Sequence, residues 1–311
     1  MKKKVIAVVG PTAVGKTKLS IAIAKQYNGE IISGDSMQVY KGMDIGTAKI
    51  THEEMQGVPH YLIDIKKPDE SFSAADFKHY VMEYIDHITS KNKIPIIVGG
   101  SGLYIQAALY NYNFPTHKKD DRIIQRIEKE IEMMGIEPAY QRLQQIDPQQ
   151  ASRIHPNNHR RVIRALEIYE STGKTMTAYQ KQQQTESPYD LKLIGLEMDR
   201  TMLYDRINQR VNEMIEKGLV EEVRSLYQAG YAQEQAMRAI GYKEFIPYFE
   251  GESSLSETIE TLKQNSRRYA KRQYTWFRNK MNVDWYSIIP ETINEKFRKI
   301  LYDLAGFLKD R

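Results

Sequence analysis

The sequence predicts an α/β fold in which a parallel sheet forms the core and a helical domain is inserted into it. Over the first hundred residues, short aliphatic runs alternate with helical segments, as expected when helices cover both faces of a parallel sheet. These runs are apolar throughout, which is typical of strands that are buried on both faces. A strand-like run returns near residue 191, after a long stretch that shows only helical periodicity.

The first part of the core is expected to span residues 1–114. Its first helix should end at Asn28 and Gly29, a pair that favours the left-handed turn after a helix. Ser73 is placed to cap the start of the next helix. Strands are expected at residues 5–9, 30–34, 61–65 and 94–100, and helices at residues 16–27 and 71–90.

A helical insertion domain is expected at residues 115–189, and the second part of the core at residues 190–311. Prolines and glycines divide the insertion into several helices, and the polar tract 181–187 has the composition of a linker. In the second part of the core, strands are expected at residues 191–198 and 283–288, and helices at residues 201–217, 220–229 and 256–280.

Length and composition limit the class of protein. A chain of 311 residues is long enough for about two domains, and 41% hydrophobic residues supply a core. The absence of cysteine excludes disulfides, zinc fingers and a cysteine nucleophile. No apolar run approaches the ~18 residues of a membrane span, and the run after the basic residues 2–4 is too short for a signal peptide. We expect a cytoplasmic monomer that does not associate with membranes.

Positive charge is concentrated in two segments, although the net charge is only +5. Residues 263–280 contain seven basic residues and no acidic one, and residues 151–181 contain six basic residues against two acidic ones. Such clustering is typical of a protein with a polyanionic partner. On the long helix expected at residues 256–280, one stripe of apolar and polar residues is separate from a basic face that includes Arg268, Lys271, Arg272 and Arg278. For this basic face we favour contact with a phosphate backbone over simple solvation.

The sharpest motif is G-x-x-x-x-G-K-[ST], which follows the first expected strand and opens the first expected helix. Its residues are Gly10, Pro11, Thr12, Ala13, Val14, Gly15, Lys16 and Thr17. The backbone N–H groups of such a loop form a nest for anions, and the start of the helix adds its dipole. Lys16 supplies a positive charge, and the Thr17 hydroxyl is a ligand for Mg²⁺. We therefore expect a P-loop NTPase-like core that binds a phosphate chain.

Three further features are candidates for the same crevice, because ligands bind at the carboxyl ends of parallel strands. Asp35 follows the second strand and is a candidate general base; the alternative is a helix-cap or turn aspartate. Ser101 follows the fourth strand and offers a hydroxyl; the alternative is a plain helix cap. Arg206 and Arg210 share one helical face and suit a diphosphate, although an exposed charged face is equally compatible with the spacing.

The same residues also resemble those of one family. The segments GPTAVGKT, GDSMQVYKGMDIGTAK, PHYLIDI, GGSGLY, HRRVIRALEIYESTGK, AIGYKE and YAKRQYTWFR follow one another as in the tRNA dimethylallyltransferases, also called tRNA isopentenyltransferases. The resemblance covers nearly the whole chain, from residue 5 to about residue 278. It implies transfer of a dimethylallyl group from its diphosphate to the N6 amine of the adenine 3′ of the anticodon.

The resemblance also implies roles for individual residues. The P-loop would hold the diphosphate of the prenyl donor with Mg²⁺, Asp35 would accept a proton from the amine, and Ser101 would stand where the family usually has threonine. Lys16 and Arg206 or Arg210 would stabilise the departing diphosphate. Contacts to tRNA are expected from Asp35, Ser36, Met37, Gln38, Ser101, His159, Arg160, Arg161, Val162, Ile163, Gly241, Tyr242, Lys243, Arg267, Arg268, Lys271 and Arg272. The insertion would close on the anticodon stem-loop.

Met37 departs from the family, which usually has arginine at that position, and one contact to the RNA is weakened accordingly. Three other functions compete with the transferase. A P-loop kinase for a small metabolite leaves the two basic segments unexplained. A non-enzymatic RNA-binding protein leaves Asp35 and Ser101 without a role. A prenyltransferase for free AMP or ADP needs neither the basic helix nor the insertion. A nucleotide-hydrolysing motor is disfavoured, because the fourth strand ends in glycines and only Asp64 is offered as a metal-binding acid.

Overall fold

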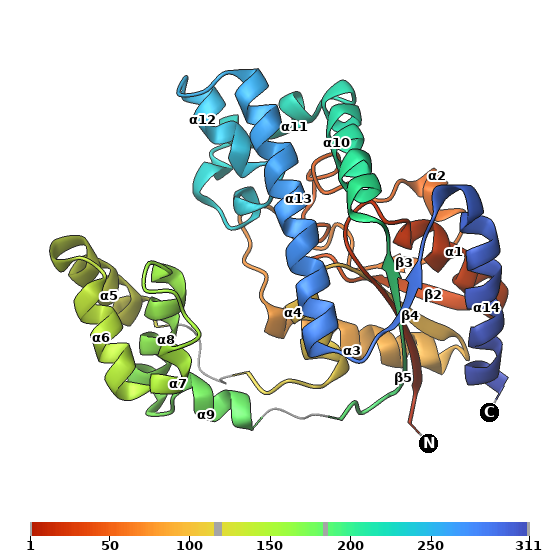
Figure 1. Ribbon diagram of the computed structural model, residues 1–311, viewed down its shortest axis with the longest axis horizontal. Coiled ribbons are helices and arrows are strands. Elements are labelled where there is room, and N and C mark those ends of the chain that lie inside the picture. Colours follow the sequence, from red (N-terminus) through yellow and green to blue (C-terminus); the bar gives the residue numbers. More distant parts are fainter. Residues whose placement is uncertain (1, 115–119, 183–185, 310–311) are drawn as a thin grey trace. The chain divides into compact units, whose positions relative to one another are not determined.

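The computed structural model of the chain describes residues 2–114, 120–182 and 186–309. Two compact units are present (Figure 1). The core unit consists of Met1–Tyr110 and Ser187–Arg311, and the helical unit of Asn111–Glu186. Of the helices in the described ranges, none is both long and apolar enough to cross a membrane.

Six parallel strands form one sheet in the core unit, in the order β3-β2-β4-β1-β5-β6. They are β1 (Lys4–Val9), β2 (Gly29–Ser33), β3 (His60–Tyr61), β4 (Ile94–Gly99), β5 (Asp190–Glu197) and β6 (Asp284–Ser287). Strand β1 pairs with β4 on one side and with β5 on the other, so the sheet resumes after the helical unit. The predicted α/β fold class with a parallel sheet is confirmed.

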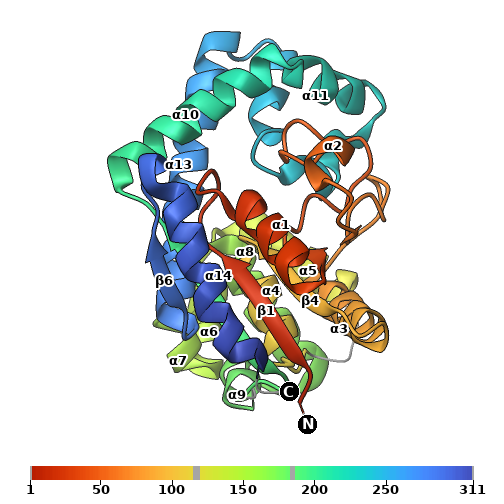
Figure 2. The same ribbon diagram turned by 90° about the vertical axis from the view of Figure 1, so that its right-hand side faces the viewer.

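Helices cover both faces of this sheet. On one face, α1 (Lys16–Tyr27) and α14 (Ile293–Lys309) lie side by side over Ile6 and Val8 of β1 (Figure 2). On the other face, α3 (Ala74–Ser90) and α4 (Gly102–Leu109) pack over Ala7 and Val9. Successive β1 side chains therefore enter opposite cores, which explains why the strand is apolar at every position.

A helical segment of the core unit connects β5 to β6. It contains α10 (Arg200–Glu216), α11 (Leu219–Gln228), the short turns η1 (Tyr231–Gln233), η2 (Ala236–Arg238) and η3 (Lys243–Phe245), α12 (Ile246–Phe249) and α13 (Leu255–Lys280). Ser254 and Glu257 form a capping box that fixes the start of α13. Helix α13 packs along α10 and reaches α4, so its side chains approach the sheet from its carboxyl end.

Two parts of the core unit differ from the sequence prediction. The third expected strand, residues 61–65, contributes only His60–Tyr61 to the sheet, because Leu62 (φ 62°) and Asp64 (φ 55°) take left-handed backbone conformations and turn the chain away. After residue 288, where no element was expected, η4 (Pro290–Thr292) and α14 follow. The remaining short helix is α2 (His52–Met55), which starts at the Thr51–Glu54 capping box.

The helical unit has a core of its own. It contains α5 (Asp121–Met134), α6 (Glu137–Ile146), α7 (Pro148–Ala151), α8 (His159–Thr172) and α9 (Met176–Lys181). Side chains such as Ile127, Leu143 and Leu166 are fully buried between them. The unit begins at residue 111 and ends at residue 186, near the expected limits of 115 and 189. Of the polar tract expected as a linker, residues 183–185 lie outside the described residues.

Candidate active site

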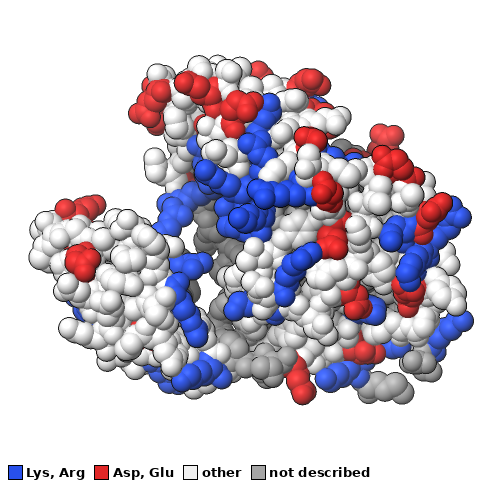
Figure 3. All heavy atoms as spheres, in the orientation of Figure 1, with Lys and Arg blue, Asp and Glu red and all other residues white. Residues whose placement is uncertain are grey.

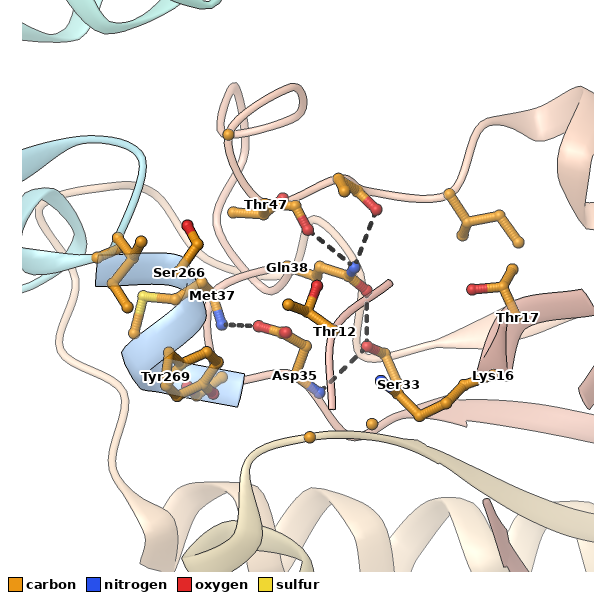
Figure 4. A pocket seen from close by; sticks show the side chains of 18 of the residues that line it. Thr12, Lys16, Thr17, Ser33, Asp35, Met37, Gln38, Thr47, Ser266 and Tyr269 are labelled. Atoms are coloured by element: carbon orange, nitrogen blue, oxygen red, sulfur yellow. Dashed lines mark hydrogen bonds between the residues drawn. The ribbon is translucent and has the colours of Figure 1, made fainter. Parts of the chain in front are cut away.

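A cavity of about 500 Å³ opens in the core unit where the carboxyl ends of β1, β2 and β4 meet. Figure 4 shows Lys16 and Thr17 at one side of it, Asp35 near the middle, and Ser266 and Tyr269 of α13 at the other side. The polar residues that line it come from segments that are far apart in the sequence, and they include Thr12, Lys16, Thr17, Asp35, Gln38, Arg210, Tyr269, Arg272 and Gln273.

The P-loop at residues 10–17 connects β1 to α1. Gly10 has φ 142°, and a Cβ atom there would lie 2.5 Å from the Leu196 carbonyl oxygen, so only glycine fits. Lys16 Nζ donates hydrogen bonds to the carbonyl oxygens of Gly10 (3.0 Å) and Pro11 (2.6 Å). Burial and, after it, the positive charge of Arg210 lower the pKa of Lys16 to about 7, with Asp35 opposing the shift. A bound polyanion would favour the charged lysine.

Both candidate arginines reach the P-loop from α10. Arg210 Nη1 donates to Thr12 Oγ1 at 3.1 Å, and Arg206 Nε donates to the Ala13 carbonyl oxygen at 2.9 Å. Only Arg210 lines the cavity, whereas Arg206 is exposed. The structure thus distinguishes two residues that the helical spacing left equivalent, and it favours Arg210 as the one that meets a ligand.

Asp35 occupies the turn after β2. Its Oδ1 atom accepts the Met37 N–H at 2.8 Å, so the residue does make the turn contact that the alternative interpretation expects. It also lines the cavity, where Lys16 and Arg210 lie close enough to act on its charge. Burial raises the pKa of Asp35, and the Met37 N–H and the two cations limit the rise. A carboxyl with a raised pKa, facing a cavity, is a candidate proton acceptor.

Ser101 lies directly behind Asp35. It precedes α4 but makes no side-chain cap; its Oγ atom instead accepts the Ser36 N–H at 3.1 Å and donates to Ser36 Oγ at 3.3 Å. Ser101 is 8% exposed and does not line the cavity. Its hydroxyl therefore fixes the segment after Asp35, and the structure does not place it among the cavity-lining residues.

Helix α13 contributes a residue that was not among the expected site residues. Gln273 is 5% exposed, and its Oε1 atom accepts the Thr12 N–H at 3.0 Å. A Cβ atom on Gly100 would lie 1.9 Å from Gln273 Nε2, so the glycine makes room for this side chain. Thr12 is therefore held by α13 and α10 together.

Burial of Tyr269, four residues before Gln273, raises its pKa to about 12, so the phenol stays protonated. Arg272 lies over the Tyr269 ring, with 5.6 Å between the guanidinium carbon and the ring centroid. The basic face of α13 therefore begins at the cavity itself.

Comparisons with known proteins identify the family. A family model described as IPP transferase matches residues 38–280. A protein of Oceanobacillus iheyensis called tRNA dimethylallyltransferase is 60% identical, over 100% of this chain and 99% of its own length. A protein of Bacillus cytotoxicus with the same name is 56% identical, over 99% and 96%. This chain belongs to the IPP transferase family.

Solved structures agree. The crystal structure of a tRNA isopentenylpyrophosphate transferase from Bacillus halodurans has a TM-score of 0.75 and 49% identity, and the match covers 100% of this chain and 98% of that one. A eukaryotic dimethylallyltransferase, described as acting on tRNA, has a TM-score of 0.85 and 32% identity, over 99% and 80%. The chain is accordingly a transferase, and the predicted relationship to this family is confirmed.

Burial divides the RNA-binding set expected for this IPP transferase into buried and exposed members. On α8 of the helical unit, Val162 and Ile163 are 0% and 8% exposed, because they pack into the core of that unit. On the core unit, Gly241 and Tyr242 are also buried. The side chains of Val162, Ile163 and Tyr242 therefore offer little surface to RNA. His159, Arg160, Arg161 and Lys243 are exposed.

The basic face of α13 is confined to three residues. Arg268, Lys271 and Arg272 are exposed, and across the described ranges no carboxylate forms an ion pair with them. Arg267 instead donates to Asn208 Oδ1 at 2.5 Å, and Arg278 pairs with Glu197. Figure 3 shows lysine and arginine side chains gathered over the part of the core unit where α13 lies.

Besides Asp35, the acidic residue Glu54 lines the cavity, where it also closes the capping box of α2. Asp64 pairs with Lys49 at 2.6 Å and does not line the cavity. Within residues 2–114, 120–182 and 186–309, no cluster of three or more His, Cys, Asp or Glu side chains could hold a metal ion. The oxygen of Thr17, at the first turn of α1, faces the cavity and is a suitable hard ligand for Mg²⁺ once a diphosphate supplies further oxygens.

Proposed function

We propose that this IPP transferase moves a dimethylallyl group from dimethylallyl diphosphate to the exocyclic N6 amine of the adenine 3′ of the anticodon in tRNA, and releases diphosphate. One observation carries the proposal: a single cavity joins a diphosphate cradle, a buried carboxylate and a basic helix. The names of the relatives support the same substrates.

The reaction needs positioning and charge stabilisation more than covalent catalysis. The bond between the allylic carbon and the diphosphate oxygen breaks while the bond from the amine nitrogen to that carbon forms. The amine proton passes to Asp35, whose raised pKa makes it a better acceptor than an ordinary carboxylate. Lys16 and Arg210 lie where the negative charge develops on the departing diphosphate. The Thr17 hydroxyl would hold a Mg²⁺ ion, which would neutralise further charge.

The RNA would be held by exposed basic residues of both units. On the core unit these are Lys243, Arg268, Lys271 and Arg272, and on the helical unit His159, Arg160 and Arg161. Contacts of this kind position an RNA without reading its bases. The target adenine must leave its stack to reach a cavity of this size. Within the cavity, Asp35, Ser36, Met37 and Gln38 form the wall that would meet the base, with Ser101 supporting Ser36.

The direct test incubates the protein with labelled dimethylallyl diphosphate, Mg²⁺ and unmodified tRNA that has adenine next to the anticodon. We expect label in the tRNA and none in AMP supplied in a parallel reaction. Label in AMP alone would show transfer to a free nucleotide, and consumption of ATP without any prenyl transfer would show a kinase. A tRNA with guanine in place of the target adenine is the matched control and should remain unlabelled.

A further inference from the structure

A carboxylate outside the cavity holds the loop that forms one of its walls. The side chain of Glu222, on α11, accepts three consecutive backbone N–H groups: those of Asp44 (3.0 Å) and Ile45 (2.8 Å) on Oε2 and that of Gly46 (3.1 Å) on Oε1. The Tyr242 hydroxyl donates a fourth hydrogen bond to Oε1 at 2.7 Å. Four donors on one carboxylate make a strong, directional anchor.

Packing reinforces this anchor. Tyr242 is fully buried, and its ring lies against Gly46 so closely that a Cβ atom there would be 2.5 Å from Cε2. Gly241 has φ 99°, and a Cβ atom at this position would lie only 3.1 Å from the Gly46 carbonyl oxygen. The segment that carries Tyr242 and the loop that carries Gly46 are therefore in direct backbone contact.

The anchored loop reaches the proposed adenine-binding wall. Residues Gly46, Thr47 and Ala48 line the cavity. Gln38 Nε2 donates to the Thr47 and Ala48 carbonyl oxygens, both at 3.3 Å, and these bonds are drawn in Figure 4. Gln38 Oε1 accepts from Ser33 Oγ at 2.9 Å, so the position of the loop sets the orientation of the Gln38 amide.

A second anchor holds the other end of the same loop. Lys49 has a side chain that is only 5% exposed, and its Nζ atom donates to the Tyr40 carbonyl oxygen (2.7 Å), Asp44 Oδ1 (2.5 Å) and Asp64 Oδ1 (2.6 Å). Removing the Glu222 contacts would leave this anchor in place. The expected consequence is a local loosening of the loop and not unfolding of the protein.

We propose that Glu222, supported by Tyr242, is a positioning residue for the acceptor base: it fixes the loop at residues 44–48 and, through it, the Gln38 amide. This assignment rests on the proposed function, because it takes the Gln38 side of the cavity as the acceptor side. The residue itself touches neither substrate. Its loss should therefore weaken use of the RNA and leave use of the prenyl diphosphate, which the P-loop binds, nearly unchanged.

The experiment compares Glu222→Gln and Tyr242→Phe with the wild type and with Glu221→Gln, the exposed neighbour on α11. We expect Glu222→Gln to lower kcat/KM for tRNA by about tenfold or more, because the loop loses hydrogen bonds to a charged group. Tyr242→Phe removes only one of the four hydrogen bonds and should lower kcat/KM for tRNA less. KM for dimethylallyl diphosphate should change by less than about twofold. Glu221→Gln should match the wild type.

Amide hydrogen exchange tests the anchor without relying on the reaction. Glu222→Gln should speed exchange in peptides that contain residues 44–46 and leave peptides of α1 and β4 unchanged. Unchanged exchange together with unchanged kinetics for tRNA would overturn the proposal, and so would an equal loss of affinity for both substrates. A wild-type protein that transfers no prenyl group would reject the proposed function alone, because the exchange result would still report on the anchor.

Discussion

At the scale of single residues, Asp35 makes a turn contact and has a proposed role as proton acceptor, and one pair of substitutions tests the two functions. Asparagine keeps an oxygen that can accept the Met37 N–H but cannot accept a proton at neutral pH, whereas alanine loses both functions. We expect Asp35→Asn and Asp35→Ala to reduce single-turnover transfer by ~10²-fold or more, as for loss of a general base, while tRNA binding persists. A rate for Asp35→Asn near that of the wild type, with saturating substrates, would reject the base assignment.

Lys16 should make diphosphate binding depend on pH. Because burial lowers its pKa to about 7, the free protein loses this charge as the pH rises through 7, and the affinity for an anion falls in the same direction. We expect calorimetry with inorganic pyrophosphate to show proton uptake on binding at about pH 8, since the ligand restores the charged form. Lys16→Arg, which stays charged, is the control for ionisation of the ligand. Equal proton uptake by both proteins would contradict the prediction.

Elements whose ends are encoded locally were predicted well from the sequence. The bounds of α1 follow from the P-loop and Asn28, and Ser73 caps α3 as expected. The site contacts that were missed have a different character, because each joins segments that are distant in the sequence. Gln273 meets Thr12 across 261 positions, and Glu222 meets Gly46 across 176. No local sequence pattern predicts such a contact.

A related reason explains why the sequence did not separate the buried from the exposed members of the RNA-binding set. A segment that follows a family pattern contains both exposed and buried positions, and the pattern alone does not separate them. Val162 has the helical spacing of a core residue, and the structure places it at 0% exposure next to the exposed Arg161. Tyr242 is buried for a different reason, because its hydroxyl has a carboxylate partner on another element.

Helix α13 offers a test at the scale of one element. Replacing Arg268, Lys271 and Arg272 by glutamine removes three exposed cations that have no ion pair among the described residues. If all three meet phosphates, the slope of log affinity for tRNA against log salt should fall by about two units, at ~0.7–0.9 per contact. Replacing Lys296, Arg298 and Lys299 on α14 by glutamine makes the same change in net charge. An equal effect of both triple variants would mean that only net charge matters.

At the scale of the whole molecule, the proposal requires that both units bind one RNA. Arg160 and Arg161 begin α8 of the helical unit and are exposed, whereas the cavity with its P-loop belongs entirely to the core unit. Replacing both arginines by glutamine should therefore raise KM for tRNA roughly tenfold, at about 0.5–1 kcal/mol for each contact, and leave kcat and pyrophosphate affinity unchanged. Arg122 and Lys129, exposed on α5 of the same unit, provide the matched double substitution. A kcat that falls with KM unchanged would mean that the helical unit acts on the chemical step and not on tRNA binding. Identical behaviour of the two double variants would remove α8 from the RNA-binding surface.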